Sequence, residues 1–202
     1  MRRNNILDKA LKQQVPFLIK SGKITDQREF TIITNDPSMT AWGYSILTYS
    51  NEILFVDCIK TEKLAKKLRI RVGDDDCRRI HEIGCILRDV INKYNVNFII
   101  GELPGGGSKS SSAAKSLGQA KSILQSAATF LNISIEWFSE GDAKKAVLRK
   151  QSATKQEMID AIDKLYDVPW TGTKYKDEAI ADSLAIYYVA SQQSSILKMF
   201  RK

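Results

Sequence analysis

Two acidic residues stand at the ends of short apolar runs that have the composition of buried strands. Asp36 follows the run FTIIT, and Glu102 follows the run NFIIG. Burying a carboxylate is costly unless a cation compensates its charge. Either residue alone could be an ordinary turn or strand-end residue. Two of them, each at the tip of a strand expected to be central, indicate a site that binds a cation.

A second acidic pair lies near the C-terminal end of the chain, in a segment with helical periodicity. Glu178 and Asp182 are four residues apart, so they share one face of a helix. If they meet Asp36 and Glu102, the carboxylates repel one another, and divalent cations are the usual resolution. Oxygen-rich sites suit Mg²⁺ and Mn²⁺, and two ions can promote phosphodiester hydrolysis together. The alternative is that the pair only complements the helix dipole.

Helix geometry separates two candidates for the fourth carboxylate. At 100° per residue, Glu178 lies about 40° from Asp182 around the helix axis, whereas Asp177 lies about 140° away. We therefore predict that Glu178 shares a metal ion with Asp182. Asp177 is expected to be an N-terminal helix residue that stabilises the helix only.

The elements that would position these residues follow from the hydrophobic pattern. Residues 1–29 contain an amphipathic stretch and a polar turn, and are expected to be a partly helical N-terminal extension. From residue 30 the sequence predicts three consecutive strands, a helix from Asp74 to Tyr94, an almost wholly apolar strand ending at Glu102, a glycine- and serine-rich loop, a helix and a further strand. Helical segments follow at about 141–148 and 154–166, with a last helix from about 177 to 190. The order βββαβαβα predicts an α/β domain over 30–202, with a mixed five-stranded sheet flanked by helices.

Composition and charge favour a nucleic-acid partner without proving one. The 202 residues carry 31 Lys and Arg against 23 Asp and Glu, a formal net charge of +8. No apolar run approaches the ~20 residues of a membrane span, and no signal peptide is evident. Three cysteines without a C-x-x-C pair fit a reducing compartment. We expect a cytoplasmic or nucleoid-associated protein, in the host cytoplasm if its source is a virus.

Four motifs in order resemble those of the RuvC Holliday junction resolvases, members of the RNase H and retroviral-integrase superfamily. IITNDPSMTAWGYSIL resembles the family's first motif, and IIGELP resembles its strand ending in Glu. SSAAKSLGQAKSILQSAA resembles the helix with a Leu-Gly-Gln-Ala core, and EAIADSLAIYYVA resembles the C-terminal acidic motif. The likeness spans about residues 31–190.

The resemblance implies a function and a set of residue roles. It implies an RNase H-like fold and a homodimer that makes paired cuts in a four-way DNA junction or related branched DNA, leaving 5′-phosphate and 3′-hydroxyl ends. Asp36, Glu102, Glu178 and Asp182 would bind two Mg²⁺ ions, with Mn²⁺ able to substitute. Lys144 and Lys155 fall where the family carries basic residues important for catalysis and DNA contact, and Lys155 is placed among the catalytic residues. Further expected DNA contacts are Lys109, Lys115, Trp170 and Lys174, the last two in a loop of mixed aromatic and basic residues.

The sequence departs from the family at two places. The family commonly carries an acid or His three residues before the last Asp, and this chain has Ala179 there. The family often places an aromatic residue soon after the strand-end Glu, where it wedges into the junction, and this chain has Pro104-Gly105-Gly106-Gly107. Junction opening could therefore proceed differently, and strict junction specificity does not follow from the resemblance.

Several alternatives compete with this hypothesis. Cys77, His81 and Cys85 fall at i, i+4 and i+8 on a helix, with Cys58 as a conceivable fourth zinc ligand, although buried thiols explain them more simply. The glycine-rich loop lacks the spacing of a P-loop, Ser112 to Lys115 matches an S-x-x-K motif without its companion motifs, and the single His81 disfavours a Ser-His-Asp hydrolase. At the level of function, the alternatives are a non-catalytic branched-DNA-binding protein that kept the fold, and an actin-like phosphotransferase.

Overall fold

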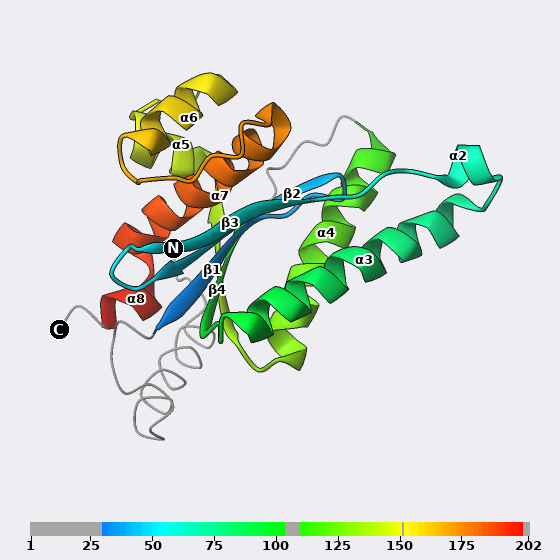
Figure 1. Cartoon of the computed structure of the whole chain (residues 1–202), viewed down its shortest axis with the longest axis horizontal. Helices are drawn as coiled ribbons and strands as arrows, with labels where there is room; N and C mark the ends of the chain where they lie inside the picture. The colour runs from blue at the N-terminus through cyan, green and yellow to red at the C-terminus, as the bar shows by residue number, and fades with distance from the viewer. Residues whose placement is uncertain (1–29, 104–109, 151, 200–202) are drawn as a thin grey trace, which may run out of the picture.

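The computed structural model describes residues 30–103, 110–150 and 152–199 (Figure 1). The expected N-terminal extension at 1–29, the loop residues 104–107 and the expected DNA contact Lys109 lie outside this range.

A five-stranded mixed sheet forms the centre of the protein, as the sequence predicts. Its strands are β1 (Thr31–Asp36), β2 (Ala41–Thr48), β3 (Ile53–Lys60), β4 (Phe98–Leu103) and β5 (Ser134–Ser139), in the spatial order β3-β2-β1-β4-β5. The first three strands pair antiparallel, whereas β1, β4 and β5 run parallel. The carboxyl ends of β1, β4 and β5 therefore meet at one edge of the sheet.

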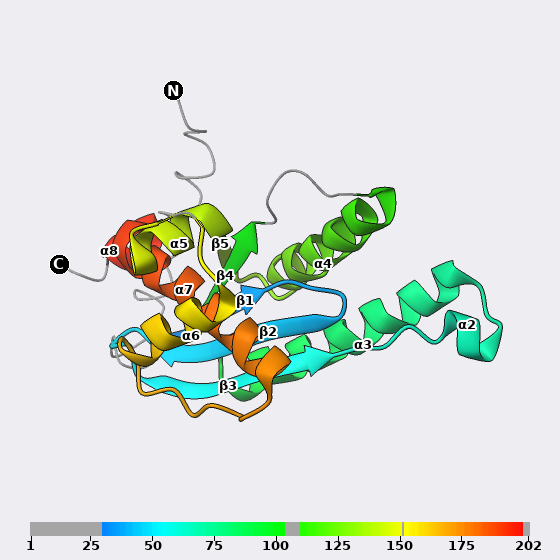
Figure 2. The same cartoon turned by 90° about the horizontal axis from the view of Figure 1, so that it is seen from above.

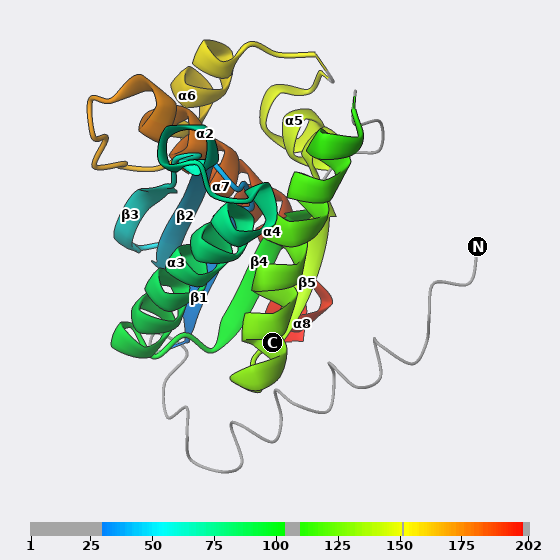
Figure 3. The ribbon, with the colours of Figure 1, turned by 90° about the vertical axis from the view of Figure 1, so that its right-hand side faces the viewer.

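Helices cover both faces of the sheet (Figure 3). One face packs against α3 and α4, and the other packs against α7, on which α5 and α6 rest. In Figure 2 the short α2 and the start of α3 extend beyond the sheet. The helices are α2 (Ala65–Leu68), α3 (Val72–Lys93), α4 (Ser111–Phe130), α5 (Glu140–Leu148), α6 (Lys155–Asp163), α7 (Lys174–Gln193) and α8 (Ser195–Met199).

The period-two alternation of β1 assigns its side chains to the two faces. Ile32 belongs to the core under α7, and Ile33 belongs to the core under α3 and α4. Thr34 points toward α7, because its hydroxyl donates a hydrogen bond of 2.9 Å to the carbonyl oxygen of Ser183. Asp36, two residues further, leaves the strand on the same face.

A glycine allows α7 to approach the sheet beside Asp36. Gly43 pairs with Asp36 across β1 and β2, and a Cβ atom at Gly43 would lie 2.0 Å from the carbonyl oxygen of Ala179. Further along, the hydroxyls of Ser45 and Ser183 are 2.6 Å apart. These contacts place the first half of α7 directly over the end of β1.

The last helix starts earlier than the sequence analysis predicts. We expected a loop through Lys176 and a helix from about Asp177, whereas α7 begins at Lys174. The segment TGTKYK is polar and has no apolar period, so nothing in its pattern distinguishes a first helical turn from a loop. Within the described residues, no helix is both long and apolar enough to span a membrane.

Candidate active site

Asp36 and Glu102 emerge next to each other because their strands are parallel neighbours. Asn35 pairs with Gly101 in the β1–β4 register, so each acid occupies the next position along its strand. Glu102 is two residues from Ile100 and four from Phe98 along β4, so its side chain lies on the same face of the sheet as theirs. Both of these apolar residues belong to the core under α7. Both carboxylates therefore lie on the α7 face, at the carboxyl edge of the sheet.

Asp182 joins them from the helix above. Ser183, the next residue, is bonded to both β1 and β2, which fixes this turn of α7 against the sheet. The Asp182 side chain is 13% exposed and forms an ion pair with Lys155. Lys155 is the first residue of α6, whose start is fixed by a capping box between Thr154 and Glu157. We refer to Asp36, Glu102 and Asp182 as the acidic cluster.

Burial and mutual repulsion disfavour ionisation of the acidic cluster. Desolvation and then the charge of Asp182 raise the pKa of Asp36 to about 7. Desolvation, followed by the charges of Asp36 and Asp182, raises the pKa of Glu102 to about 9. Burial also raises the pKa of Asp182, although Lys155 opposes this. Burial alone would lower the pKa of Lys155, but the charge of Asp182 and the hydrogen bond to it raise this pKa overall. Lys155, with a smaller contribution from Lys144 at Asp182, thus offsets the negative charge of the three carboxylates only in part.

The donor set of the acidic cluster suits a hard divalent cation. Its members offer carboxylate oxygens, the ligands that Mg²⁺ and Mn²⁺ prefer, and a cation would relieve the repulsion that raises their pKa values. As the side chains stand, no three acidic, His or Cys groups in the described part of the chain are arranged to hold an ion, and Asp182 is paired with Lys155 instead. The fit therefore rests on the chemistry and burial of the donors.

Glu178 is the residue that we predicted from the sequence as the fourth carboxylate. This residue is partly buried one turn before Asp182, and its side chain makes no hydrogen bond or ion pair with the other described residues. Asp177 instead accepts hydrogen bonds of 2.9 Å and 2.7 Å from the backbone N–H and hydroxyl of Thr171, which tie the preceding loop to α7. Ala179 is 5% exposed and packs against Gly43, so the position three residues before Asp182 lies against the sheet.

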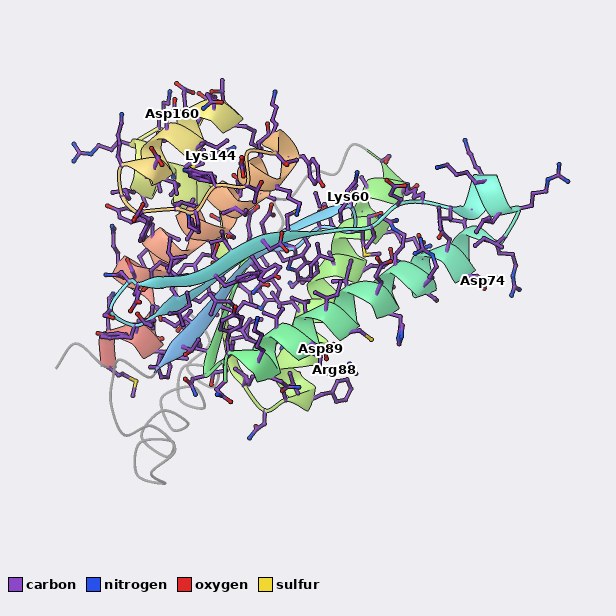
Figure 4. The ribbon with its side chains drawn as sticks, viewed as in Figure 1. Lys60, Asp74, Arg88, Asp89, Lys144 and Asp160 are labelled. Carbon is purple, nitrogen blue, oxygen red and sulfur yellow. The ribbon has the colours of Figure 1, made fainter. Side chains whose placement is uncertain are left out.

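The expected DNA contacts occupy different parts of the protein. Lys144 on α5 lies on the α7 side, whereas Arg88 and Asp89 mark α3 on the other side (Figure 4). Lys144 pairs with Glu140, and Lys115 on α4 pairs with Asp76 of α3 at 2.7 Å. Lys174 is exposed at the start of α7. Trp170 is partly buried against the core and donates its ring N–H to Asp163 at 2.7 Å.

Glu140, the first residue of α5, was not among the site residues that we predicted from the sequence. Its charge contributes to the raised pKa values of Asp36, Glu102 and Asp182. The signal was present in the sequence: Glu140 directly follows the strand-like run ISIEWFS, as Glu102 directly follows NFIIG.

The zinc alternative finds no support in the described residues. Cys77 and His81 are exposed on α3, so the expectation of a buried thiol is wrong for Cys77. Cys85 lies 3.5 Å from the Nε2 atom of His81, but they form no group of three potential ligands. Cys58 is buried on β3, where it pairs with Gly43 under α7 rather than α3.

Solved structures similar to this chain share its fold. RuvC of T. thermophilus in complex with a Holliday junction substrate superposes with a TM-score of 0.65 at 16% identity, covering 80% of this chain and 93% of that one. The yeast mitochondrial Holliday junction resolvase Ydc2 superposes with a TM-score of 0.59 at 15% identity, covering 92% of this chain and 88% of that one. Both likenesses confirm the expected RNase H-like arrangement of a mixed five-stranded sheet flanked by helices.

The sequence itself identifies the family. No curated protein sequence matches this chain. The profile of the family described as "Crossover junction endodeoxyribonuclease RuvC" matches residues 32–189, a span that begins in β1 and ends in α7 and so contains the whole acidic cluster. The chain belongs to the RuvC family of crossover junction endodeoxyribonucleases.

Proposed function

We propose that this protein is a divalent-metal-dependent endonuclease that cuts Holliday junctions or related branched DNA by paired phosphodiester hydrolysis. The observation that carries the proposal is the acidic cluster: three largely buried carboxylates converge from β1, β4 and α7, with a single lysine paired to one of them. An uncompensated buried cluster of one sign is costly to the fold, and a function that needs it is the usual reason for its presence.

Each carboxylate is attached to a different packed element of the fold, and such an arrangement can keep the geometry of a metal site fixed. Asp36 is attached to the middle strand of the sheet and Glu102 to its parallel neighbour, while Asp182 is fixed through the bonds of Ser183. We propose that these three, with Glu178 from the preceding turn, bind two Mg²⁺ ions, for which Mn²⁺ can substitute. Such ions supply positive charge that activates water and stabilises the negative charge on the reacting phosphate.

The two lysines near the acidic cluster are suited to hold the DNA strand. Lys155 and Lys144 each extend from the first or second turn of a helix that packs on α7, and each is paired with a carboxylate. We propose that phosphate oxygens of the bound strand replace these carboxylate partners. Charge-assisted bonds from lysine would then orient the scissile phosphate and stabilise the charge that develops on it.

A four-way junction requires two symmetrical cuts, and one chain carries one acidic cluster. We therefore propose that the active form is a homodimer whose twofold axis coincides with that of the junction.

A gel assay tests this proposal directly. Purified protein should cut a four-way junction in Mg²⁺ or Mn²⁺, should cut linear duplex at least about 100-fold more slowly, and should be inactive in EDTA. Asp36→Asn, Glu102→Gln and Asp182→Asn should each abolish cleavage while leaving junction binding intact, because each removes one negative charge from a site that faces DNA. Tight junction binding by the wild-type protein without cleavage in either metal would show a branched-DNA-binding protein instead.

A further inference from the structure

Glu140 on α5 lies near the acidic cluster, because it follows the carboxyl end of a strand, β5, that runs parallel to the strand of Glu102. Strands β4 and β5 are parallel, and their register pairs Leu103 with Ser139. Glu140 comes next and begins α5. It therefore leaves the sheet at the carboxyl edge, one strand away from Glu102 and two strands away from Asp36.

The packing of α5 keeps Glu140 close to the acidic cluster. Helix α5 packs against α7, which carries Asp182, and Lys144 one turn later pairs with Glu140. The Glu140 and Lys144 charges both act on Asp182, with opposite effects on its pKa. The Glu140 charge reaches Asp36 and Glu102 as well. In the β4–β5 register Glu102 pairs with Phe138, which packs against the core under α7, and Glu140 follows two residues later, so it leaves β5 beside the acidic cluster.

Helix capping does not account for Glu140, because other residues perform that task. The Ser139 hydroxyl accepts a hydrogen bond of 3.0 Å from the backbone N–H of Asp142 and donates one of 2.7 Å to the Asp142 carboxylate. Ser139 and Asp142 thus form the N-terminal cap of α5. The Glu140 side chain is 47% exposed, and its partner among the described residues is Lys144. An ion pair that solvent reaches in this way is weak, so another cation can replace Lys144 as the partner of Glu140.

The last helix also leaves room for a carboxylate from elsewhere. Ala179, three residues before Asp182, is packed against Gly43. A longer side chain there would meet the sheet rather than extend the acidic cluster.

We propose that Glu140 is a further metal-binding carboxylate of this protein, contributed by α5 to the site formed by the acidic cluster. This inference rests on the proposed metal-dependent function. On binding a divalent cation, the Glu140 carboxylate exchanges Lys144 for the ion, and Lys144 becomes available to a DNA phosphate.

Mn²⁺ binding, measured by calorimetry on the full chain, tests the proposal without relying on cleavage. Glu140→Gln should weaken Mn²⁺ binding by about tenfold or more, the size of effect seen when a residue supporting a metal site is removed. Asp142→Asn is the matched control, since it removes the same charge from the same helical turn, and it should change the affinity less than about twofold. The metal-free thermal stability of Glu140→Gln should equal or exceed that of the wild type.

Cleavage at increasing Mn²⁺ concentration gives an independent readout. Junction cleavage by Glu140→Gln should be impaired at low Mn²⁺ and recover at high Mn²⁺, whereas Asp36→Asn should not recover. If wild-type protein binds Mn²⁺ and cuts junctions, and Glu140→Gln binds the ion equally well, this inference fails while the proposed function stands. If wild-type protein neither binds Mn²⁺ nor cuts, both fail.

Discussion

Two groups of buried charge lie on opposite faces of the sheet, and their chemistry differs. On the α7 face, the acidic cluster has raised pKa values, because burial and like charges act together. On the α3 face, Arg79 is 1% exposed and lies beside Asp76 at 4.0 Å. A hydrogen bond from Lys115 lowers the pKa of Asp76.

Arg79 shows what a fully satisfied buried charge looks like. Its Nε atom donates to the Thr61 hydroxyl at 2.8 Å, and its Nη2 atom donates to the Met39 carbonyl oxygen and to the Thr40 hydroxyl at 3.3 Å. The group formed by Arg79, Asp76 and Lys115, which we call the α3 network, thereby holds the turn that follows Asp36.

Buried charges have a structural role in the α3 network and a different role in the acidic cluster. In the α3 network each charge has an opposite charge or hydrogen-bond partners, so the structure itself explains its presence. In the acidic cluster the charges are of one sign and only partly compensated, so a ligand is needed to explain them. The candidate site therefore differs from the rest of the structure in the excess of buried charges of one sign, and not in burial alone.

The largest effect we expect concerns how far the acidic cluster extends along α7. Glu178→Gln should lower single-turnover junction cleavage by orders of magnitude, because Glu178 lies about 40° from Asp182 around the helix axis. Asp177→Asn should leave the cleavage rate within about threefold and should affect only the stability of the fold, because the Asp177 carboxylate accepts hydrogen bonds from Thr171. Cleavage rates of both variants across a Mg²⁺ series decide the matter. An active Glu178→Gln beside an inactive Asp177→Asn would reverse the assignment.

The opposite behaviour is expected of the α3 network. Arg79→Met should reduce the free energy of unfolding by about 3–5 kcal/mol, because it leaves the Met39 carbonyl and Asp76 without their buried partner. Arg88→Met, on an exposed part of the same helix, should leave the free energy of unfolding nearly unchanged, because an exposed ion pair contributes little. Urea unfolding of the metal-free proteins measures both. Equal losses in the two variants would mean that the α3 network does not stabilise the turn as its bonds suggest.

The strand-end carboxylates were predictable because a charge at the end of an apolar run violates the ordinary pattern of a buried strand. Asp36 and Glu102 each show this signature, and their parallel strands brought them together as expected. Glu140 shows it too, but the run before it is less apolar and the sequence analysis did not apply the rule a third time.

Partners across the fold could not be predicted in the same way. Nothing in the sequence connects Lys155 with Asp182, or Lys115 with Asp76, because each pair is created by packing between elements distant in the chain. The full burial of Arg79 was also unexpected, since an arginine on a helix is usually exposed. Sequence patterns reveal which residues are costly to bury, whereas the identity of the compensating groups depends on tertiary structure.

A pH dependence of stability is also expected, and it belongs to the acidic cluster. In the folded metal-free protein the pKa of Glu102 is about 9, compared with an ordinary value of 4.5. Between these values the folded state retains a proton that the unfolded chain has lost, so Glu102 destabilises the fold increasingly as pH rises, and this cost disappears as pH falls toward 4.5. Glu102→Gln has no such proton to retain.

Thermal unfolding in EDTA at pH 5, 7 and 9 therefore sharpens the contrast between the two faces. The Tm of Glu102→Gln should exceed that of the wild type, and the gap should widen from pH 5 to pH 9, at about 2–4 °C for each kcal/mol in a chain of this size. Asp76→Asn should show no such widening, because the pKa of Asp76 is already below its ordinary value and both states are ionised across this range. Saturating Mg²⁺ should narrow the Glu102→Gln gap most at high pH, where the ionised carboxylates bind the cation best. A gap of constant size from pH 5 to pH 9 would show that Glu102 ionises normally in the folded protein, and the acidic cluster would then resemble the α3 network more than we infer.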